Sequence, residues 1–182
     1  RILNNGKMNR KEIKSYFANL TIGAGAVAWS ITSNEHAAQT LTKISAFSTS
    51  TDTSHNHLCE GDQSIGGMVM QTNSEELLHA GIDVAKKAWN KFLDITGWSS
   101  SSPELIVTHQ VGRAHQHEIE KALGYNPSKS FNTYETLGNS GSVSLPISYT
   151  IACEKNPELI NQKSALLGIG SGLSSLMLAL NN

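Results

Sequence analysis

A histidine stands where an apolar segment of the chain stops. Residues 105–107 (LIV) are followed by Thr-His-Gln, with the histidine at position 109, and residues typical of a helix come next. Proteins of the α/β class bind their ligands beyond the carboxyl ends of buried parallel strands. His109 is therefore a candidate site residue, although its position alone fits an ordinary capping histidine equally well.

An asparagine occupies a second position of this kind. Asn139 lies in the sequence LGNSG (137–141), just before a segment typical of a helix. Asn-Ser-Gly is a favourable turn sequence, and asparagine is a common N-terminal cap of helices. Taken alone, Asn139 is as compatible with a turn or a cap as with a functional site.

A glycine-rich segment near the C-terminus, GIGSG at 168–172, superficially resembles a nucleotide-binding loop. Such a loop must open a helix whose N-terminus holds the phosphate, but here the apolar run 176–180 follows. We therefore expect no nucleotide. The segment predicts a tight turn, or a turn whose glycines let backbone N–H groups approach a reacting carbonyl.

Histidine and cysteine side chains also raise the hypothesis of a metal site. His55, His57 and Cys59 alternate within a polar segment, but no second ligand pair stands at a familiar spacing. We therefore expect no metal, and a polar active-site or surface loop instead. His115 and His117 are two residues apart in an expected helix, so they should point in different directions and be solvated.

Strands are expected in the first third of the chain. Small residues, glycines and β-branched residues over 17–31 predict a buried strand with a close-approach bend at Gly23–Gly25. Residues 41–50 predict a second strand. Residues 51–73 are polar and glycine-rich without a period, which predicts a long loop.

Helices and strands alternate in the rest of the chain. Apolar residues at three- and four-residue steps predict a helix from a capping box at Asn73 to a stop at Gly97. The other expected elements are a strand at 104–108, a helix at 111–123 ended by Gly124, a short strand at 130–134, a helix with Pro146 near its first turn, and two adjacent strands flanking the turn at 168–172. This alternation predicts the α/β class.

Composition excludes several classes of protein. The 182 residues include 14 basic and 15 acidic ones, and no basic stripe is present, so nucleic acid is not an expected partner. No apolar run is long enough to span a membrane, and no secretory signal is visible. Two cysteines are too few for a disulfide framework, which favours the cytoplasm.

Three segments considered together give a more specific prediction. HQVG after a strand, LGNSGSVSLPI before a helix and GIGSGLSS between two strands occur in that order. This arrangement resembles the thiolase-superfamily condensing enzymes, specifically 3-oxoacyl-[acyl-carrier-protein] synthase III. The segments SHNHLCEGD, HQVGRAH and GIGSGLS look most like the olefin-biosynthesis branch, which condenses two long acyl chains head to head.

The resemblance implies a layered α-β-α-β-α thiolase fold and covers nearly the whole chain. Residues 1–72 would be the end of the N-terminal thiolase half with a long loop, and residues 73–182 the C-terminal half with the histidine and asparagine motifs. The complete enzyme would be a cytoplasmic homodimer. A half-fold on its own would expose a large apolar surface, so the isolated chain is expected to be poorly soluble or obligately paired.

The resemblance also implies a reaction and the residues that perform it. The reaction is Claisen condensation of acyl thioesters, in fatty acid or long-chain hydrocarbon biosynthesis. His109 and Asn139 would together stabilise one enolate-like oxygen, with their nitrogens about 3–5 Å apart. Backbone N–H groups at Gly170, Ser171 and Gly172 would form a second oxyanion hole. No cofactor is expected, and acyl-CoA or acyl-carrier protein would deliver the substrates.

One departure from the family pattern concerns the nucleophile, which is a cysteine near the end of the family's N-terminal half. Neither Cys59 nor Cys153 stands at a matching position. The resemblance therefore implies that this chain alone is inactive and that its partner is a missing N-terminal half that bears the cysteine. The alternative is a non-catalytic subunit of a split condensing enzyme. A hydrolase is less well supported, because no serine nucleophile elbow is present.

Overall fold

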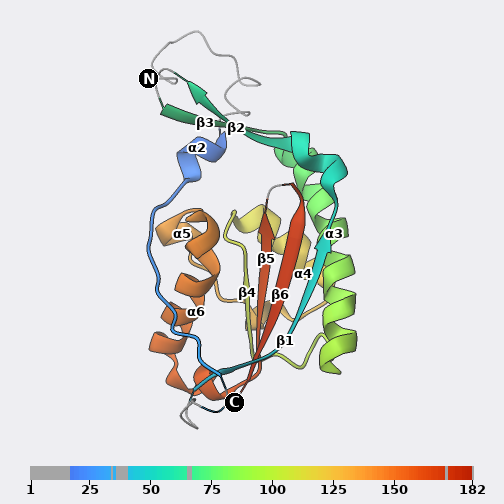
Figure 1. The fold of residues 1–182 in the computed structure, drawn as a ribbon, viewed down its shortest axis with the longest axis vertical. Coiled ribbons are helices and arrows are strands. Elements are labelled where there is room, and N and C mark those ends of the chain that lie inside the picture. The colour runs from blue at the N-terminus through green and yellow to red at the C-terminus, as the bar shows by residue number, and fades with distance from the viewer. Residues whose placement is uncertain (1–16, 34, 36–40, 65–66, 171, 182) are drawn as a thin grey trace.

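A four-stranded mixed sheet forms the centre of the protein in a computed structural model, which describes residues 17–33, 35, 41–64, 67–170 and 172–181 (Figure 1). Its strands are β1 (Lys43–Thr51), β4 (Leu105–Thr108), β5 (Ser164–Gly170) and β6 (Ser174–Asn181), in the spatial order β1-β6-β5-β4. β4 runs parallel to β5, and the other two pairings are antiparallel. The expected α/β class is confirmed.

Helices pack on both faces of this sheet. α3 (Ser74–Thr96) and α4 (Arg113–Leu123) lie on one face and α6 (Ser144–Lys155) on the other (Figure 1). Alternation along β6 serves both faces, since Met177 and Ala179 join the core under α3 while Leu180 joins the core under α6. The core under α3 is built around the buried aromatic side chains Trp89, Phe92 and Tyr125, with Ile106 of β4 beside them.

The helix expected between Asn73 and Gly97 is confirmed as α3. Asn73 Oδ1 accepts a hydrogen bond from the backbone N–H of Glu76 at 3.5 Å, which satisfies one of the free N–H groups of the first turn. Gly97 ends the helix with φ of 66°, in the left-handed region that favours glycine.

Most of the other expected elements are also confirmed. β1, β4 and α4 lie where strands and a helix were expected, and Gly124 ends α4 with φ of 68°. Pro146 lies in the first turn of α6, where a missing N–H costs no helical hydrogen bond. β5 and β6 are adjacent and antiparallel on either side of the glycine-rich turn.

The strand expected over 17–31 is wrong. The chain forms the short helix α2 (Phe17–Thr21) and then an extended segment that joins the Asn139 loop through one isolated bridge at Ile22. Within the described residues no strand lies alongside the segment to form a ladder, and Ile31 is 75% exposed. The expected close approach is confirmed, because a Cβ on Gly23 would lie 1.7 Å from the carbonyl oxygen of Leu137.

The long loop expected over 51–73 is also wrong. This stretch forms the 3₁₀ helix η2 (Thr53–Leu58) and a hairpin of β2 (Cys59–Ser64) and β3 (Gly67–Thr72). Side-chain periodicity did not reveal the hairpin because antiparallel pairing is made by the backbone and needs no apolar alternation.

A short strand expected over 130–134 is absent. Ser130 makes a single parallel bridge to Ile106, and the chain then turns into α5 (Tyr134–Leu137). The backbone N–H groups of Thr133 and Tyr134 donate to the side chain of Gln110, so they are not available to a strand ladder. The remaining short elements are η3 (Pro127–Lys129), η4 (Gly141–Val143) and η5 (Pro157–Asn161).

The face of the sheet that carries α6 is only partly covered. Phe47 on β1 and Leu176 on β6 are 62% and 43% exposed on this face. α6 itself carries apolar side chains all round its axis, a pattern typical of a helix buried on every side. No described helix is long and apolar enough to cross a membrane.

Candidate functional site

His109 directly follows the last residue of β4. Its backbone N–H donates to the carbonyl oxygen of Leu167 on β5 at 3.0 Å, which continues the parallel pairing one residue beyond β4. The side chain is half-buried, and burial lowers the pKa of the imidazole, with a smaller effect from the nearby charge of His115. The neutral imidazole is therefore favoured, with one nitrogen that donates a hydrogen bond and one that accepts.

The expectation that His115 is solvated is wrong. This residue lies in the first turn of α4, close after the end of β4, and its side chain is half-buried. Burial lowers its pKa, and it is near enough to His109 to lower that pKa as well. His117 is exposed, as expected.

Gln110 is a positioning residue that the sequence did not single out. Its side chain is fully buried, and its Nε2 donates to the carbonyl oxygen of Thr108 at 2.8 Å. Its Oε1 accepts from the backbone N–H of Thr133 at 2.6 Å and of Tyr134 at 3.0 Å. Gln110 thus joins the end of β4 to the start of α5. The available signal was a polar residue directly beyond a buried strand.

A buried polar network extends from β4 away from this junction. The hydroxyl of Thr108 bonds to Gln116 Oε1, and Gln116 Nε2 donates to the carboxylate of Glu120 at 2.8 Å. Ser130 also donates to that carboxylate at 2.8 Å. These bonds attach the first part of α4 to the residue that precedes His109.

Asn139 lies in the loop between α5 and η4. Its backbone N–H donates to the carbonyl oxygen of Thr21 and its carbonyl oxygen accepts from the N–H of Gly23, each at 2.8 Å. Its side-chain Oδ1 accepts from the N–H of Gly141 at 3.0 Å. The turn-forming interpretation of this side chain is therefore confirmed for its oxygen, and the Nδ2 group is left to serve as a donor elsewhere.

The glycine-rich turn begins where β5 ends. Gly170 is the last residue of β5, and a Cβ there would meet no atom within 4 Å, so its backbone borders open space. Gly172 has φ of 107°, which favours glycine. Ser171, the middle residue of the expected oxyanion turn, lies outside the described residues.

These segments are found at one end of the sheet. His109 and Gly170 follow or end the parallel strands β4 and β5 at their carboxyl ends. α6 begins at the same end, because Leu145 Cδ1 lies 3.0 Å from where a Cβ on Gly168 would be. The Asn139 loop leads directly into η4 and α6, and Gln110 ties the start of α5 to the end of β4.

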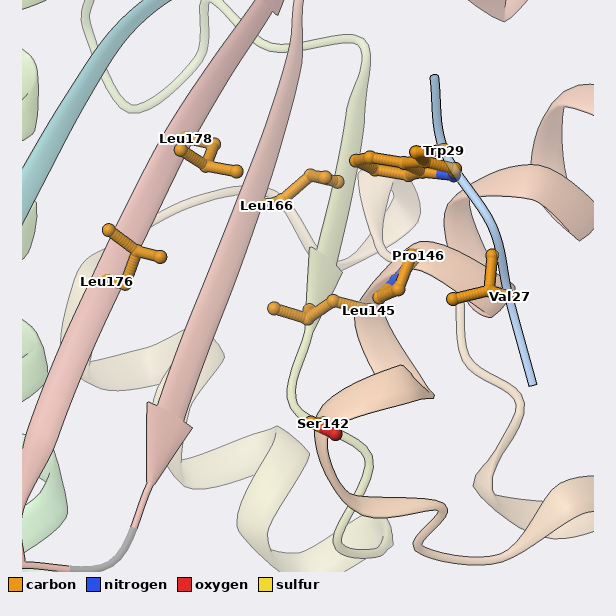
Figure 2. Close-up of a pocket in the computed structure, with 8 residues that line it drawn as sticks. All are labelled: Val27, Trp29, Ser142, Leu145, Pro146, Leu166, Leu176 and Leu178. Atoms are coloured by element: carbon orange, nitrogen blue, oxygen red, sulfur yellow. The ribbon is translucent and has the colours of Figure 1, made fainter. Parts of the chain in front are cut away.

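An apolar pocket of about 240 Å³ lies over β5 and β6 on the face of the sheet that carries α6 (Figure 2). Val27 and Trp29 of the extended segment line one side and Leu176 and Leu178 of the sheet the other, and the first turn of α6 lies between them. Its full lining is Val27, Trp29, Ser142, Leu145, Pro146, Leu166, Leu176 and Leu178. Such a lining can hold alkyl or aromatic groups.

The other cysteine and histidine candidates do not join this end of the sheet. His55 and His57 lie in η2, and Cys59 starts β2. The described residues contain no group of three side chains able to hold a metal ion. Cys153 is buried in α6, and burial raises its pKa, which disfavours the nucleophilic thiolate.

Comparison with known proteins tests the resemblance. Residues 93–181 match the family described as 3-oxoacyl-[acyl-carrier-protein (ACP)] synthase III C terminal. Acyl-CoA:acyl-CoA alkyltransferases from Shewanella oneidensis and Xanthomonas campestris are 34% and 31% identical to the chain, over 90% and 93% of its length. A crystal structure of Xanthomonas campestris OleA superposes with a TM-score of 0.83 at 26% identity and covers 99% of the chain.

These matches define the class of protein. The chain has a thiolase-like fold, and its residues 93–181 are similar to the C-terminal domain of 3-oxoacyl-[acyl-carrier-protein] synthase III. Within that class it is similar to the acyl-CoA:acyl-CoA alkyltransferases and to OleA, so the resemblance found in the sequence is confirmed. The chain spans about half the length of these relatives, 49% of each alkyltransferase and 51% of the OleA chain.

Proposed function

We propose that this chain supplies the oxyanion-stabilising part of an enzyme that joins two acyl thioesters by Claisen condensation. The observation that carries the proposal is the common location of three segments. His109 and Gly170 follow or end the parallel strands β4 and β5 at one edge of the sheet, and Gln110 binds the start of α5, which leads into the Asn139 loop, to the same edge. Ligands of α/β proteins bind at this end of parallel strands.

The reaction begins with transfer of an acyl group to a cysteine thiolate, with CoA or acyl-carrier-protein thiol as the leaving group. The α-carbon of a second acyl thioester, freed of a proton or of carbon dioxide, then attacks the acyl-enzyme carbonyl. The enzyme thiolate leaves, and a 3-oxoacyl thioester is formed. Both steps place negative charge on an oxygen that was a thioester carbonyl.

In this scheme His109 and Asn139 stabilise the enolate oxygen of the second thioester. A neutral imidazole N–H and the Asn139 Nδ2 both donate to it, and each such donor in a dry site contributes about 3 kcal/mol to the transition state. The lowered pKa of His109 supports this role, because a neutral imidazole presents a donor without bringing a buried positive charge. Backbone N–H groups at Gly170, Ser171 and Gly172 stabilise the oxygen on the acylated cysteine.

The nucleophilic cysteine lies outside this chain in the proposed enzyme. Burial and the raised pKa of Cys153 argue against that residue, and Cys59 lies in the β2–β3 hairpin. The apolar face around Phe47, Leu176 and the exposed side of α6 is the surface on which the cysteine-bearing half would pack. The chain on its own is then catalytically inactive and prone to associate.

The proposed substrates are long-chain acyl thioesters, and the proposed enzyme is a cytoplasmic homodimer. Support for the substrates comes from the alkyltransferase relatives and from a crystal structure of Xanthomonas campestris OleA with lauric acid and lauroyl-CoA bound, at a TM-score of 0.80. The reaction class places the enzyme in fatty acid or long-chain hydrocarbon biosynthesis.

The test uses the complete enzyme, this chain together with its cysteine-bearing half, and lauroyl-CoA as substrate. His109→Ala and Asn139→Ala should each lower the rate of 3-oxoacyl product formation about a hundredfold or more. The double variant should lose less than the product of the two effects, because both side chains act on one charge. His117→Ala, an exposed histidine on α4, is the matched control. Rates within threefold of wild type for His109→Ala or Asn139→Ala would contradict the proposal.

A second experiment separates a catalytic from a purely structural role. Mass spectrometry of this chain alone after incubation with lauroyl-CoA should detect no acyl group on Cys59 or Cys153. In the complete enzyme the acyl group should appear on a cysteine of the other half. Acylation of Cys59 or Cys153 would refute the placement of the nucleophile, and no acylation in the complete enzyme would favour a non-catalytic subunit.

A further inference from the structure

The Asn139 loop is bonded to a segment that lies far away in the sequence. Residues 21–23, which we call the strap, run parallel to Asn139 and bind its backbone on both sides of its Cα. Asn139 N–H donates to Thr21 O, and Gly23 N–H donates to Asn139 O, each at 2.8 Å. Both backbone hydrogen-bonding groups of Asn139 are therefore fixed by the strap.

Two glycines make this close contact possible. A Cβ on Gly23 would lie 1.7 Å from the carbonyl oxygen of Leu137, and one on Gly138 would lie 2.5 Å from the carbonyl oxygen of Thr21. Gly138 also has φ of 65°. In both cases the obstructing atom is backbone, which cannot rotate away as a side chain can. A larger residue at position 23 must therefore push the strap and the Asn139 loop apart.

The neighbouring Gly25 differs in this respect. A Cβ there would meet Ile147 Cδ1 at 2.6 Å, the far end of a flexible side chain. A rotamer change of Ile147 can relieve that contact. The same substitution at positions 23 and 25 therefore separates displacement of the Asn139 loop from a general disturbance of the segment.

The strap also determines where the Asn139 amide points. Its backbone is fixed by Thr21 and Gly23, and its Oδ1 is fixed by the N–H of Gly141. Because the backbone and the Oδ1 of Asn139 are both held by hydrogen bonds, the direction in which Nδ2 points is fixed as well. A displacement of about 1 Å is enough to lower a rate about a hundredfold when a group must meet a reacting atom.

We propose that the strap is a positioning element for the Asn139 amide, with Gly23 as its essential residue. The inference rests on the proposed function, in which Nδ2 donates to the enolate oxygen. It predicts that loosening the strap affects the condensation step, which uses Asn139, and spares the acylation step, which uses the Gly170–Gly172 turn.

The experiment compares Gly23→Ala and Gly25→Ala in the complete enzyme with lauroyl-CoA. Acylation of the cysteine is followed by quenched-flow mass spectrometry, and condensation by product formation at saturating substrate. For Gly23→Ala we expect a fall in condensation kcat of tenfold or more, with the acylation rate within threefold of wild type. For Gly25→Ala both rates should stay within threefold.

Two results would overturn the proposal. One is condensation within threefold of wild type for Gly23→Ala, and the other is an equal fall of both steps in that variant. Asn139→Ala in the same assay separates this failure from a failure of the proposed function. If Asn139→Ala leaves condensation intact, the proposed function is wrong, whereas a loss in Asn139→Ala alone refutes only the role of the strap.

A milder variant keeps the test valid if Gly23→Ala does not fold. Ile22→Gly adds no atom to the contact with Asn139 but increases the freedom of the strap. We expect it to lower condensation about five- to tenfold, with the acylation rate within threefold of wild type. Amide hydrogen exchange of the wild-type enzyme should show the Gly23 N–H more protected than that of Gly25. Unchanged condensation in Ile22→Gly, or rapid exchange at Gly23, would refute the proposal.

Discussion

Replacement of Gln110 by methionine should destabilise the protein through lost hydrogen bonds and leave no cavity. The two side chains have similar length and volume, so packing around the fully buried position is preserved. The variant leaves the N–H groups of Thr133 and Tyr134 and the carbonyl oxygen of Thr108 without the partner they have in the wild type.

The expected loss in the free energy of unfolding depends on how deeply these backbone groups are buried. An unsatisfied buried backbone group costs about 1–3 kcal/mol. Thr133 is buried and bears the full cost, whereas Tyr134 is half-buried and water can replace part of the lost bond. Together with the Thr108 carbonyl, the expected loss is about 2–5 kcal/mol, a large part of the ~5–15 kcal/mol that stabilises a typical protein.

Urea denaturation of the complete protein, followed by tryptophan fluorescence, measures this loss. The wild type and Gln110→Met should differ in midpoint and share the same slope. Gln162→Met is the control, because Gln162 is exposed and surface substitutions change stability by less than about 0.5 kcal/mol. A loss below about 1 kcal/mol in Gln110→Met would refute the reasoning, since it would mean that Gln110 does not carry the junction between β4 and α5.

Three further predictions concern stability. The pKa of His109 is lowered by burial, so the unfolded chain binds more protons below the ordinary value of 6.5 and stability rises with pH through that window. His109→Gln should reduce this slope in denaturation series between about pH 5 and 7, with the lowered pKa of His115 supplying the remainder, and an unchanged slope in this variant would contradict the prediction. Phe92→Ala should cost about 3–5 kcal/mol in urea denaturation, because the ring is fully buried; a cost near 1 kcal/mol would contradict the core assignment. Gly97→Ala should lower the free energy of unfolding by about 1 kcal/mol, because φ is 66° there, and an unchanged free energy would be inconsistent with that left-handed conformation.

The sequence predicted best those elements that carry their own local signals. α3 has a capping asparagine, a regular apolar stripe and a terminal glycine, and its bounds were predicted within a residue. β5 and β6 were predicted because a glycine-rich turn separates two apolar runs. In these elements the residues that determine the structure lie inside the element.

Elements that depend on distant partners were predicted less well. The strand propensity of residues 17–31 was real, but a strand forms only against a neighbour, and the described chain provides one bridge at Ile22. Residues 130–134 were turned away from a strand by the side chain of Gln110, more than twenty residues earlier. Neither effect can be read from the local sequence.

The candidate site divides in the same way. His109 was identifiable because a histidine directly follows an apolar strand, and Asn139 because a family motif surrounds it. The burial of His115 depends on how α4 is oriented after β4. The backbone hydrogen bonds that hold Asn139 come from the strap, residues 21–23. His109 and Asn139 could therefore be identified from the sequence, whereas the burial of His115 and the hydrogen bonds to Asn139 are visible only in the folded structure.

The order of strands in the sheet has a consequence for how the protein is made. β6 lies between β1 and β5, and Thr51 on β1 pairs with Ser174 on β6, 123 residues later. At a synthesis rate of about 5–20 residues per second, roughly 6–25 seconds pass between the appearance of the two strands on the ribosome. Throughout that interval β1, with the apolar side chains of Ile44 and Phe47, has no sheet neighbour among the described strands. Pairing of β1 with β6, which completes this sheet, can therefore form only after almost the whole chain has been synthesised.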